Sequence, residues 1–245
     1  MKTLIFAHRG ASVYRPENTI EAFALAIEQG ADGFELDVHL TKDGEIIVAH
    51  DDRLERVSDG TGHINDYTLE ELKRLNFGKL FEGKPCLVPT LAEVYSLVKS
   101  TEHKINVELK CVERIYNELP EKLIALTKEH GMEDRVIYSS FNHYFLQMIK
   151  NIDKSVKTGI LYDLAMIDPW VYAVYIGADA IHPHYRIIQA LPHTVDRCHE
   201  KGIMVNVWTA DDPQIIDMML KTRVDAIISN KPDIAVSCRD NLTVN

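Results

Sequence analysis

Two acidic side chains stand two residues apart in one apolar stretch of the sequence, and a third acid lies in another. Glu35 and Asp37 lie within GFELDVHL, and Glu108 lies within INVELK, two positions before Lys110. On a β-strand, residues i and i+2 project from the same face, so Glu35 and Asp37 would stand about 7 Å apart. Three oxygen donors with no cysteine among them favour Mg²⁺ or Ca²⁺ over zinc.

Two histidines and an arginine follow short apolar runs. His8 and Arg9 come after IFA, and His50 comes after IVA. Imidazole titrates near neutral pH, so a pair of histidines that flanks a substrate can serve as base and acid. Arg9 can bind an oxyanion through two N–H groups, and Trp208, which follows MVNV, could form one wall of a binding site. The set predicts acid–base chemistry on an anionic substrate.

Each of these groups also has a purely structural explanation. The three acids could form ion pairs with Arg9 and Lys110, and Arg9 could pair with Glu17. A strand-end histidine is often structural, Trp208 could be ordinary packing, and a strand with one polar face is typical of a half-exposed antiparallel sheet. Spacing alone does not decide between these interpretations. We assign no role to His39, His182 and Cys111.

Helical patterns alternate with short β-branched runs along the chain, which implies a parallel sheet. Eight such units in 245 residues predict a (β/α)8 TIM barrel. An open doubly wound sheet is less favoured, because no glycine-rich dinucleotide fingerprint follows the first strand. In a barrel the acids of GFELDVHL would face the mouth, where barrel enzymes carry their catalytic groups. The predicted strands are 3–8, 33–40, 104–110, 135–140, 155–161, 179–183, 203–208 and 225–229.

One region interrupts this alternation. A turn at Asp43–Gly44 and a short run ending at His50 follow the second strand, and residues 51–88 then contain a single short helical pattern at Thr68–Leu75. This is long for a connection between a strand and a helix. We therefore expect one domain, residues 1–245, with an inserted subregion at about 51–88.

Capping-box patterns predict where three helices begin. A Ser, Thr, Asp or Asn followed three residues later by Glu satisfies the first backbone N–H groups of a helix. The three pairs are Asn18 with Glu21, Thr68 with Glu71, and Thr90 with Glu93.

The composition limits the classes of partner. The formal net charge of −10 argues against nucleic acids and anionic membrane surfaces as main partners. The four cysteines are far apart, which suggests reduced thiols. The sequence contains neither a signal-peptide pattern nor an apolar run of roughly 20 residues. We expect a cytoplasmic protein without stable membrane association, and the oligomeric state stays open.

Taken together, these segments resemble the glycerophosphodiester phosphodiesterase family. Residues 7–62 combine HRG, PENT, ExD, TKDG and HD at fixed spacing, and VELK, SSF, NVWTAD and VDAIISNKPD follow in order, so the resemblance covers nearly the whole chain. Two positions depart from the commonest family pattern: Asp211 stands where Asn is frequent, and Asn230 stands where Asp is frequent. We expect both to lie away from the catalytic residues and to influence substrate preference.

The resemblance implies a TIM barrel with a small insertion after the second strand, and it implies roles for individual residues. The substrate would be a small-molecule glycerophosphodiester, and the cofactor one divalent cation, Mg²⁺ or Ca²⁺. The implied metal ligands are Glu35, Asp37 and Glu108, the catalytic acid and base are His8 and His50, and the substrate-binding residues are Arg9, Lys110 and Trp208.

The implied activity is that of a phosphoric diester hydrolase in glycerol and lipid metabolism. It would release sn-glycerol 3-phosphate and an alcohol, either through a cyclic phosphate formed by the substrate's own hydroxyl or by direct attack of water. A lysophospholipase D-like or phosphoinositide-type enzyme is the first alternative, although residues 51–88 are rich in charged and polar residues, with Phe77, Leu80 and Phe81 as the only compact apolar group. A barrel that binds phosphodiesters without turnover is the second, and it would be expected to lack a histidine or an acid.

Overall fold

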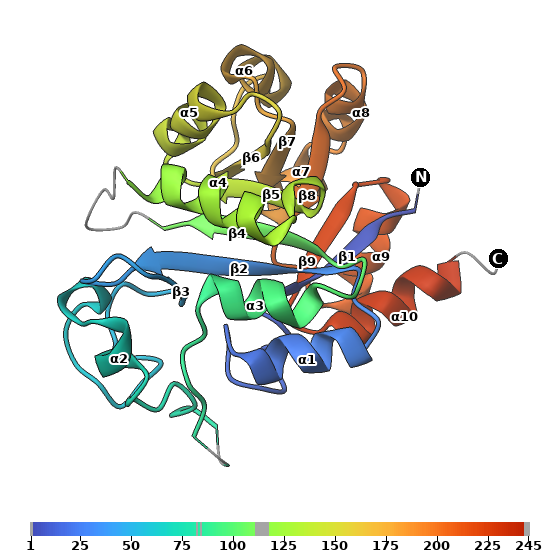
Figure 1. The fold of residues 1–245 in the computed structure, drawn as a ribbon. Helices are drawn as coiled ribbons and strands as arrows, with labels where there is room; N and C mark the ends of the chain where they lie inside the picture. The colour runs from blue at the N-terminus through green and yellow to red at the C-terminus, as the bar shows by residue number, and fades with distance from the viewer. Residues whose placement is uncertain (1, 82, 84, 111–117, 243–245) are drawn as a thin grey trace.

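The computed structural model describes residues 2–81, 83, 85–110 and 118–242, and eight parallel strands within them form a closed barrel (Figure 1). Strand β1 pairs with β9 on one side and with β2 on the other, which closes the ring. The predicted TIM barrel is confirmed. The barrel strands are β1 (Leu4–His8), β2 (Gly33–Leu40), β4 (Lys104–Leu109), β5 (Val136–Ser140), β6 (Lys157–Tyr162), β7 (Ala180–Pro183), β8 (Met204–Val207) and β9 (Ala226–Ser229).

All eight predicted strands are present, and β2 has the bounds predicted for it. The short run before His50 is also a strand, β3 (Ile46–Val48), which pairs antiparallel with the last three residues of β2. Strand β1 pairs only with the first part of β2. The end of β2 therefore projects past the ring and carries β3 towards the mouth of the barrel.

Helices fill the connections and cover the outside of the barrel. Within the described residues, none of the helices combines the length and the apolarity needed to cross a bilayer. The α-helices are α1 (Ile20–Glu28), α2 (Leu69–Leu72), α3 (Leu91–Val98), α4 (Leu119–His130), α5 (His143–Ile152), α6 (Pro169–Ile176), α7 (Tyr185–Ala190), α8 (His193–His199), α9 (Pro213–Lys221) and α10 (Pro232–Leu242).

Two of the three predicted capping boxes are confirmed, and the first is wrong. Thr68 and Thr90 cap α2 and α3, each in a reciprocal pair with the glutamate three residues later. Helix α1 is capped instead by Thr19, which has the extended backbone that an N-cap needs and accepts a hydrogen bond from Ala22 N. Asn18 has a positive φ of 57°, and this conformation turns its amide away from the helix and into the barrel mouth.

The inserted segment has a small apolar core of its own. Helix α2 is shorter than the predicted helical pattern and ends at Leu72, and a 3₁₀ turn, η1 (Ile64–Asp66), precedes it. Figure 1 shows α2 set apart from the ring of helices, beside β3. The core packs against β3 and comprises Ile47, Ala49, Leu54, Val57, Ile64, Leu72, Phe77 and Val88.

The apolar residues of β2 decide which way its acids point. Phe34, Leu36 and Val38 are fully buried in the cluster between the strands and the covering helices. Because side chains alternate along a strand, Glu35 and Asp37 must project to the inside of the barrel. The predicted orientation of GFELDVHL is confirmed.

His182 fills part of the barrel interior below the mouth. Its ring packs on Gly159, where an added Cβ would lie 2.2 Å from His182 Nε2. The same nitrogen lies 2.9 Å from the amide nitrogen of Asn206. Burial lowers the pKa of His182 to about 3, so the ring is neutral in the folded protein at neutral pH.

Acidification below about pH 6.5 is therefore expected to reduce the free energy of unfolding through His182. The unfolded residue binds a proton near its ordinary pKa of 6.5, whereas the folded residue does so only near 3. The contribution of His182 to the free energy of unfolding is complete above a pH of about 6.5. It falls by up to about 1.4 kcal/mol per pH unit as the pH drops from about 6.5 towards 3. Urea unfolding between pH 7 and pH 5 measures this slope.

In a His182→Asn variant the free energy of unfolding should depend less steeply on pH, because unfolding then takes up about one proton fewer. The matched control is His193→Asn, which removes a histidine exposed on the surface and keeps the buried His182, so it should retain the slope that His182 causes. An unchanged slope in His182→Asn would contradict the expectation.

Candidate active site

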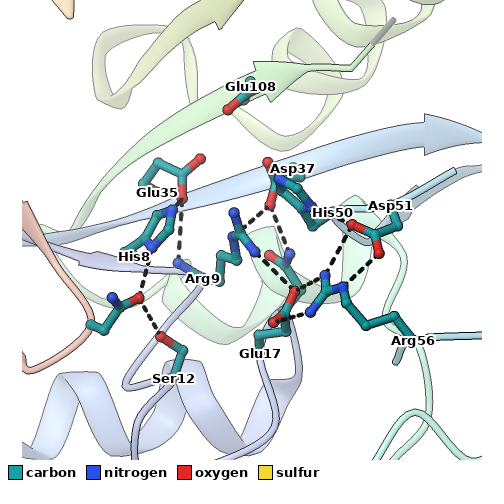
Figure 2. A network of polar contacts seen from close by, with 12 residues as sticks. His8, Arg9, Ser12, Glu17, Glu35, Asp37, His50, Asp51, Arg56 and Glu108 are labelled. Carbon is teal, nitrogen blue, oxygen red and sulfur yellow. Dashed lines mark hydrogen bonds and ion pairs between the residues drawn. The ribbon is translucent and has the colours of Figure 1, made fainter. Parts of the chain in front are cut away.

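The ends of β1, β2 and β4 bring the predicted chemical groups to one mouth of the barrel. His8 is in register with Glu35, and Asp37 is in register with Glu108. Figure 2 shows these side chains converging with Arg9 from neighbouring strands. The parallel register, which aligns the carboxyl ends of the strands, makes one site from segments about 100 residues apart.

The three acids form a compact, buried group of oxygen donors. Glu35, Asp37 and Glu108 each offer a carboxylate oxygen within 4.8 Å of the other two. Asp37 Oδ1 is buried and accepts no hydrogen bond within the described part of the chain. An all-oxygen set of buried carboxylates suits a hard divalent cation, and Lys110 Nζ, 3.2 Å from Asp37 Oδ1, is an ion-pair neighbour of this oxygen. The residues therefore fit such an ion.

Two cations already lie against this group of acids. Lys110 Nζ lies 2.7 Å from Glu108 Oε1 and 3.2 Å from Asp37 Oδ1. Arg9 Nε lies 3.4 Å from Asp37 Oδ2. The ion-pair cluster that was the structural alternative is thus present, and it coexists with donor atoms that fit a metal. Both cations also lie where they could contact an anion bound at the mouth.

The pKa values of the acids show that the two cations do not fully balance them. Burial, together with Asp37 and Glu108, raises the pKa of Glu35 well above its ordinary value. Burial also raises the pKa of Glu108 to about 7, although Lys110 opposes it. Burial acts to raise the pKa of Asp37 as well, but the positive charges of Lys110 and Arg9 outweigh burial, so the pKa of Asp37 is lowered. Further positive charge among these carboxylates would be favourable.

A tight turn after β1 positions Arg9. Its backbone has a positive φ of 56°, and its N–H donates to Glu35 O at 2.8 Å. Gly10 follows with φ 83°, and an added Cβ there would lie 2.6 Å from the backbone carbon of Ala22 in α1. Only glycine allows this conformation and this close approach to the helix. The turn aims the Arg9 side chain across the mouth towards Asp37 and Glu17.

His8 is held by a polar network from the end of β9. Its Nδ1 lies 2.7 Å from Asn230 Oδ1, which also accepts a hydrogen bond from Ser12 Oγ at 2.9 Å. Asn230 Nδ2 donates to Asp211 Oδ2 at 2.7 Å, which fixes the orientation of the amide. His8 Nδ1 must therefore be the donor, so Nε2 carries the lone pair. His8 Nε2 lies 3.7 Å from Glu35 Oε2.

This network corrects the expectation that Asp211 and Asn230 lie away from the residues predicted to be catalytic. The two positions follow β8 and β9 and meet at the mouth, where Asn230 bonds His8 directly. Sequence spacing could not reveal this contact, because closure of the barrel is what brings the last strand beside the first. Burial and the nearby Arg9 lower the pKa of His8 to about 4.

His50 is held by a carboxylate. Its Nδ1 lies 2.5 Å from Asp51 Oδ1, which leaves Nε2 unprotonated when the ring is neutral. His39 Nε2 lies 3.1 Å from His50 O, so His39 contacts the backbone that carries His50. Burial lowers the pKa of His50, and the negative charge of Asp37 opposes this.

His8 and His50 line a common cavity of about 170 Å³. Trp208 and Phe141 form an apolar side of it, with their rings edge to face at a centroid distance of 5.6 Å. The indole N–H donates to His182 O at 2.7 Å, which fixes the ring plane. The remaining lining residues are Arg9, Glu35, Asn106, Glu108, Lys110, Leu161, Thr209 and Ile228.

A larger hollow of about 610 Å³ lies at the opposite end of the barrel, before β8 and β9. Its charged side chains pair with one another: Arg223 Nη2 lies 3.3 Å from Asp196 Oδ1, and His199 Nε2 lies 2.8 Å from Asp225 Oδ2. The smaller cavity is lined by both histidines, by Glu35 and Glu108, and by Arg9 and Lys110, and it is therefore the candidate active site.

Several residues at this site were not predicted to belong to it. Asn106 shares a strand face with Glu108, and the spacing of two could have revealed it; both atoms of its amide are buried and have no hydrogen-bond partner in the described residues. Asn18, expected as a helix cap, donates to Asp37 Oδ2 at 2.9 Å. Asp51 and Arg56 lie in the inserted segment, where no helical or strand periodicity marks them as residues of the site. Cys111 lies outside the described residues.

The chain is similar to known proteins along nearly its whole length. The sequence profile of the "Glycerophosphoryl diester phosphodiesterase family" matches residues 8–234. A glycerophosphodiester phosphodiesterase of Caldanaerobacter subterraneus subsp. tengcongensis is 42% identical over 97% of this chain and 98% of its own. One of Bacillus altitudinis is 36% identical over 98% of this chain and 99% of its own. A solved Oleispira antarctica phosphodiesterase in complex with the product sn-glycerol-3-phosphate has a TM-score of 0.83 and 28% identity, covering 98% and 97% of the two chains.

Proposed function

The chain belongs to the glycerophosphoryl diester phosphodiesterase family and is a phosphoric diester hydrolase, and we propose which residues hydrolyse its glycerophosphodiester substrate to sn-glycerol 3-phosphate and an alcohol. His8 and His50 are the acid–base pair. Glu35, Asp37 and Glu108 hold one divalent cation, Mg²⁺ or Ca²⁺. The observation that carries this proposal is that both histidines line the same cavity as Glu35 and Glu108, two of the three buried acids.

A bound cation would supply positive charge to the nonbridging oxygens of the phosphodiester, whose negative charge grows in the transition state. Arg9 and Lys110 add to this charge from the protein itself. Arg9 can bind two phosphate oxygens through its planar guanidinium, whereas the Lys110 ammonium acts as a point charge. The closeness of both to Asp37, at 3.4 Å and 3.2 Å, supports this assignment.

The partners of the two histidines support different roles for them. His50 bonds a carboxylate, Asp51, which stabilises a positively charged ring. His8 bonds the neutral amide of Asn230, and burial together with the nearby Arg9 lowers its pKa to about 4, which favours a neutral ring. We therefore assign to His8 Nε2 the removal of the nucleophile's proton and to His50 Nε2 the protonation of the departing alkoxide. The nucleophile is either the substrate's glycerol hydroxyl or water.

Trp208 and Phe141 provide the apolar side against which the substrate packs. Their edge-to-face contact gives a rigid wall opposite the charged groups. This supports a small polar phosphodiester that presents its carbon skeleton to the wall and its phosphate to Arg9. The net charge of −10 supports a dissolved cytoplasmic substrate in preference to an anionic membrane.

A release assay tests the proposed reaction. The panel comprises glycerophosphocholine, glycerophosphoethanolamine, glycerophosphoglycerol, glycerophosphoinositol and lysophosphatidylcholine, each supplied with Mg²⁺ or with Ca²⁺. We expect sn-glycerol 3-phosphate to form from at least one of the first four. Selective hydrolysis of lysophosphatidylcholine would identify the alternative lipid activity, and no release from any compound with either cation would contradict the proposal.

A further inference from the structure

Arg56, in the inserted segment, binds two carboxylates at once (Figure 2). Its Nε lies 2.5 Å from Asp51 Oδ2, and its Nη2 lies 3.0 Å from Asp51 Oδ1. Its Nη1 lies 2.8 Å from Glu17 Oε2, and Nη2 lies 2.8 Å from Glu17 Oε1. Each of two edges of the guanidinium thus bonds both oxygens of one carboxylate. This fork geometry is specific to arginine.

Each of these carboxylates also bonds a residue of the catalytic mouth. Asp51 Oδ1 lies 2.5 Å from His50 Nδ1, and Glu17 Oε1 lies 3.1 Å from Arg9 Nη1. Arg56 is therefore linked through Asp51 to His50, the proposed acid. It is linked through Glu17 to Arg9, the proposed phosphate-binding residue. It joins three segments that the sequence separates: the insertion, the loop before α1 and the end of β1.

The two carboxylates need Arg56 in order to keep their present orientations. Asp51 Oδ1 and Glu17 Oε1 both bond the same nitrogen, Arg56 Nη2, so two negative groups are held close together. Their side chains are 26% and 20% exposed, which limits screening by water. Without the guanidinium, repulsion between them would favour rotation of one or both side chains. Either rotation would break the bond to His50 or the bond to Arg9.

A purely structural role for Arg56 predicts something different. Arg56 itself is 40% exposed, and many exposed ion pairs add little to stability. If Arg56 only fastened the insertion to the barrel, its loss would lower the unfolding temperature and leave the geometry of His50 unchanged. The arrangement of the four hydrogen bonds argues for orientation, because both oxygens of each carboxylate are fixed.

We propose that Arg56 is a positioning residue that fixes the tautomer of His50 through Asp51 and the direction of Arg9 through Glu17, so that the inserted segment completes the active site. This inference builds on the catalytic roles proposed above. Through Asp51 it keeps a proton on His50 Nδ1 and directs Nε2 into the cavity, where Nε2 can take up the proton that it then passes to the alkoxide. Through Glu17 it keeps the guanidinium of Arg9 facing the phosphate position.

The kinetic test compares Arg56→Gln and Arg56→Lys with the matched control Arg74→Gln. Arg74 is also in the insertion, and among the described residues its ion pair is with the exposed Glu70, four residues before it. Both Arg56 variants should lose roughly 10–100-fold in kcat/KM, since small misplacements of catalytic groups have effects of this size. Lysine should not substitute, because it cannot bond two carboxylates in a fork. The control should stay within about twofold of the unaltered protein.

A spectroscopic test separates positioning from structure. ¹⁵N NMR of labelled histidine side chains, with the His50 signals assigned by their loss in His50→Asn, reports which ring nitrogen carries the proton. We expect the Nδ1–H tautomer in the unaltered protein and a mixture in Arg56→Gln. Added guanidinium, at a concentration that leaves the fold intact, should partly restore both the tautomer and the turnover of an Arg56→Ala variant.

The outcomes are distinguishable. Unchanged kcat/KM in Arg56→Gln, or a loss of activity with an unchanged His50 tautomer and no rescue by guanidinium, would overturn the inference and leave the proposed function intact. If the unaltered protein hydrolyses no compound of the panel, the proposed function fails. The NMR comparison still decides whether Arg56 controls His50.

Discussion

Replacing either His8 or His50 by alanine is expected to lower turnover of a glycerophosphodiester by at least about 100-fold, which is the usual range for general acid–base groups. Each ring is bonded through Nδ1 and lines the same cavity, so each can exchange a proton with substrate through Nε2. Loss of either ring removes one of the two proton transfers. The measurement is kcat in the release assay under saturating substrate.

The control for these variants is His193→Ala, at an exposed position on α8, which should retain full activity. Thermal unfolding of His8→Ala and His50→Ala should show that both variants are folded. Full activity in either of them would refute the acid–base assignment. A variant at Asn230 should have a milder effect than His8→Ala, because Asn230 acts only through the imidazole that it orients.

Removing divalent cations with EDTA is expected to abolish activity, and Mg²⁺ or Ca²⁺ should restore it. The physical reason is the buried cluster of Glu35, Asp37 and Glu108, in which neighbouring carboxylates and burial raise the pKa of Glu35 and of Glu108. A divalent ion would offset that unfavourable negative charge and would supply charge to the phosphate. The measurement is turnover before chelation, after chelation, and after each cation is returned.

Direct titration of the metal-free protein gives a readout that does not depend on activity. Calorimetry should detect one binding event per chain, and Glu108→Gln should weaken it, because an amide offers a neutral oxygen in place of a carboxylate. Glu70→Gln, at an exposed position in the insertion, should bind like the unaltered protein. Turnover that resists exhaustive chelation would refute the role of the metal.

Much of the fold could be predicted from the sequence because its periodic signals are local. The run GFELDVHL contains large apolar residues at alternate positions, and the structure buries them against the helices and turns Glu35 and Asp37 inward. The caps at Thr68 and Thr90 were predicted correctly for the same reason, since a capping box involves only four residues. The cap at Asn18 was wrong because a tertiary contact to Asp37 holds the amide elsewhere.

The sequence by itself determined the barrel, the strand faces and the identity of the candidate acids and histidines, since each depends on residue type and on spacings of two to four residues. Only the tertiary structure decided how these groups are held. Asn230 reaches His8 because the last strand closes onto the first, and Arg56, which is five residues from Asp51, reaches Glu17 because the insertion packs beside the loop before α1. Ring closure brings Asn230 to His8, and packing of the insertion brings Arg56 to Glu17, so neither contact follows from a spacing along the sequence.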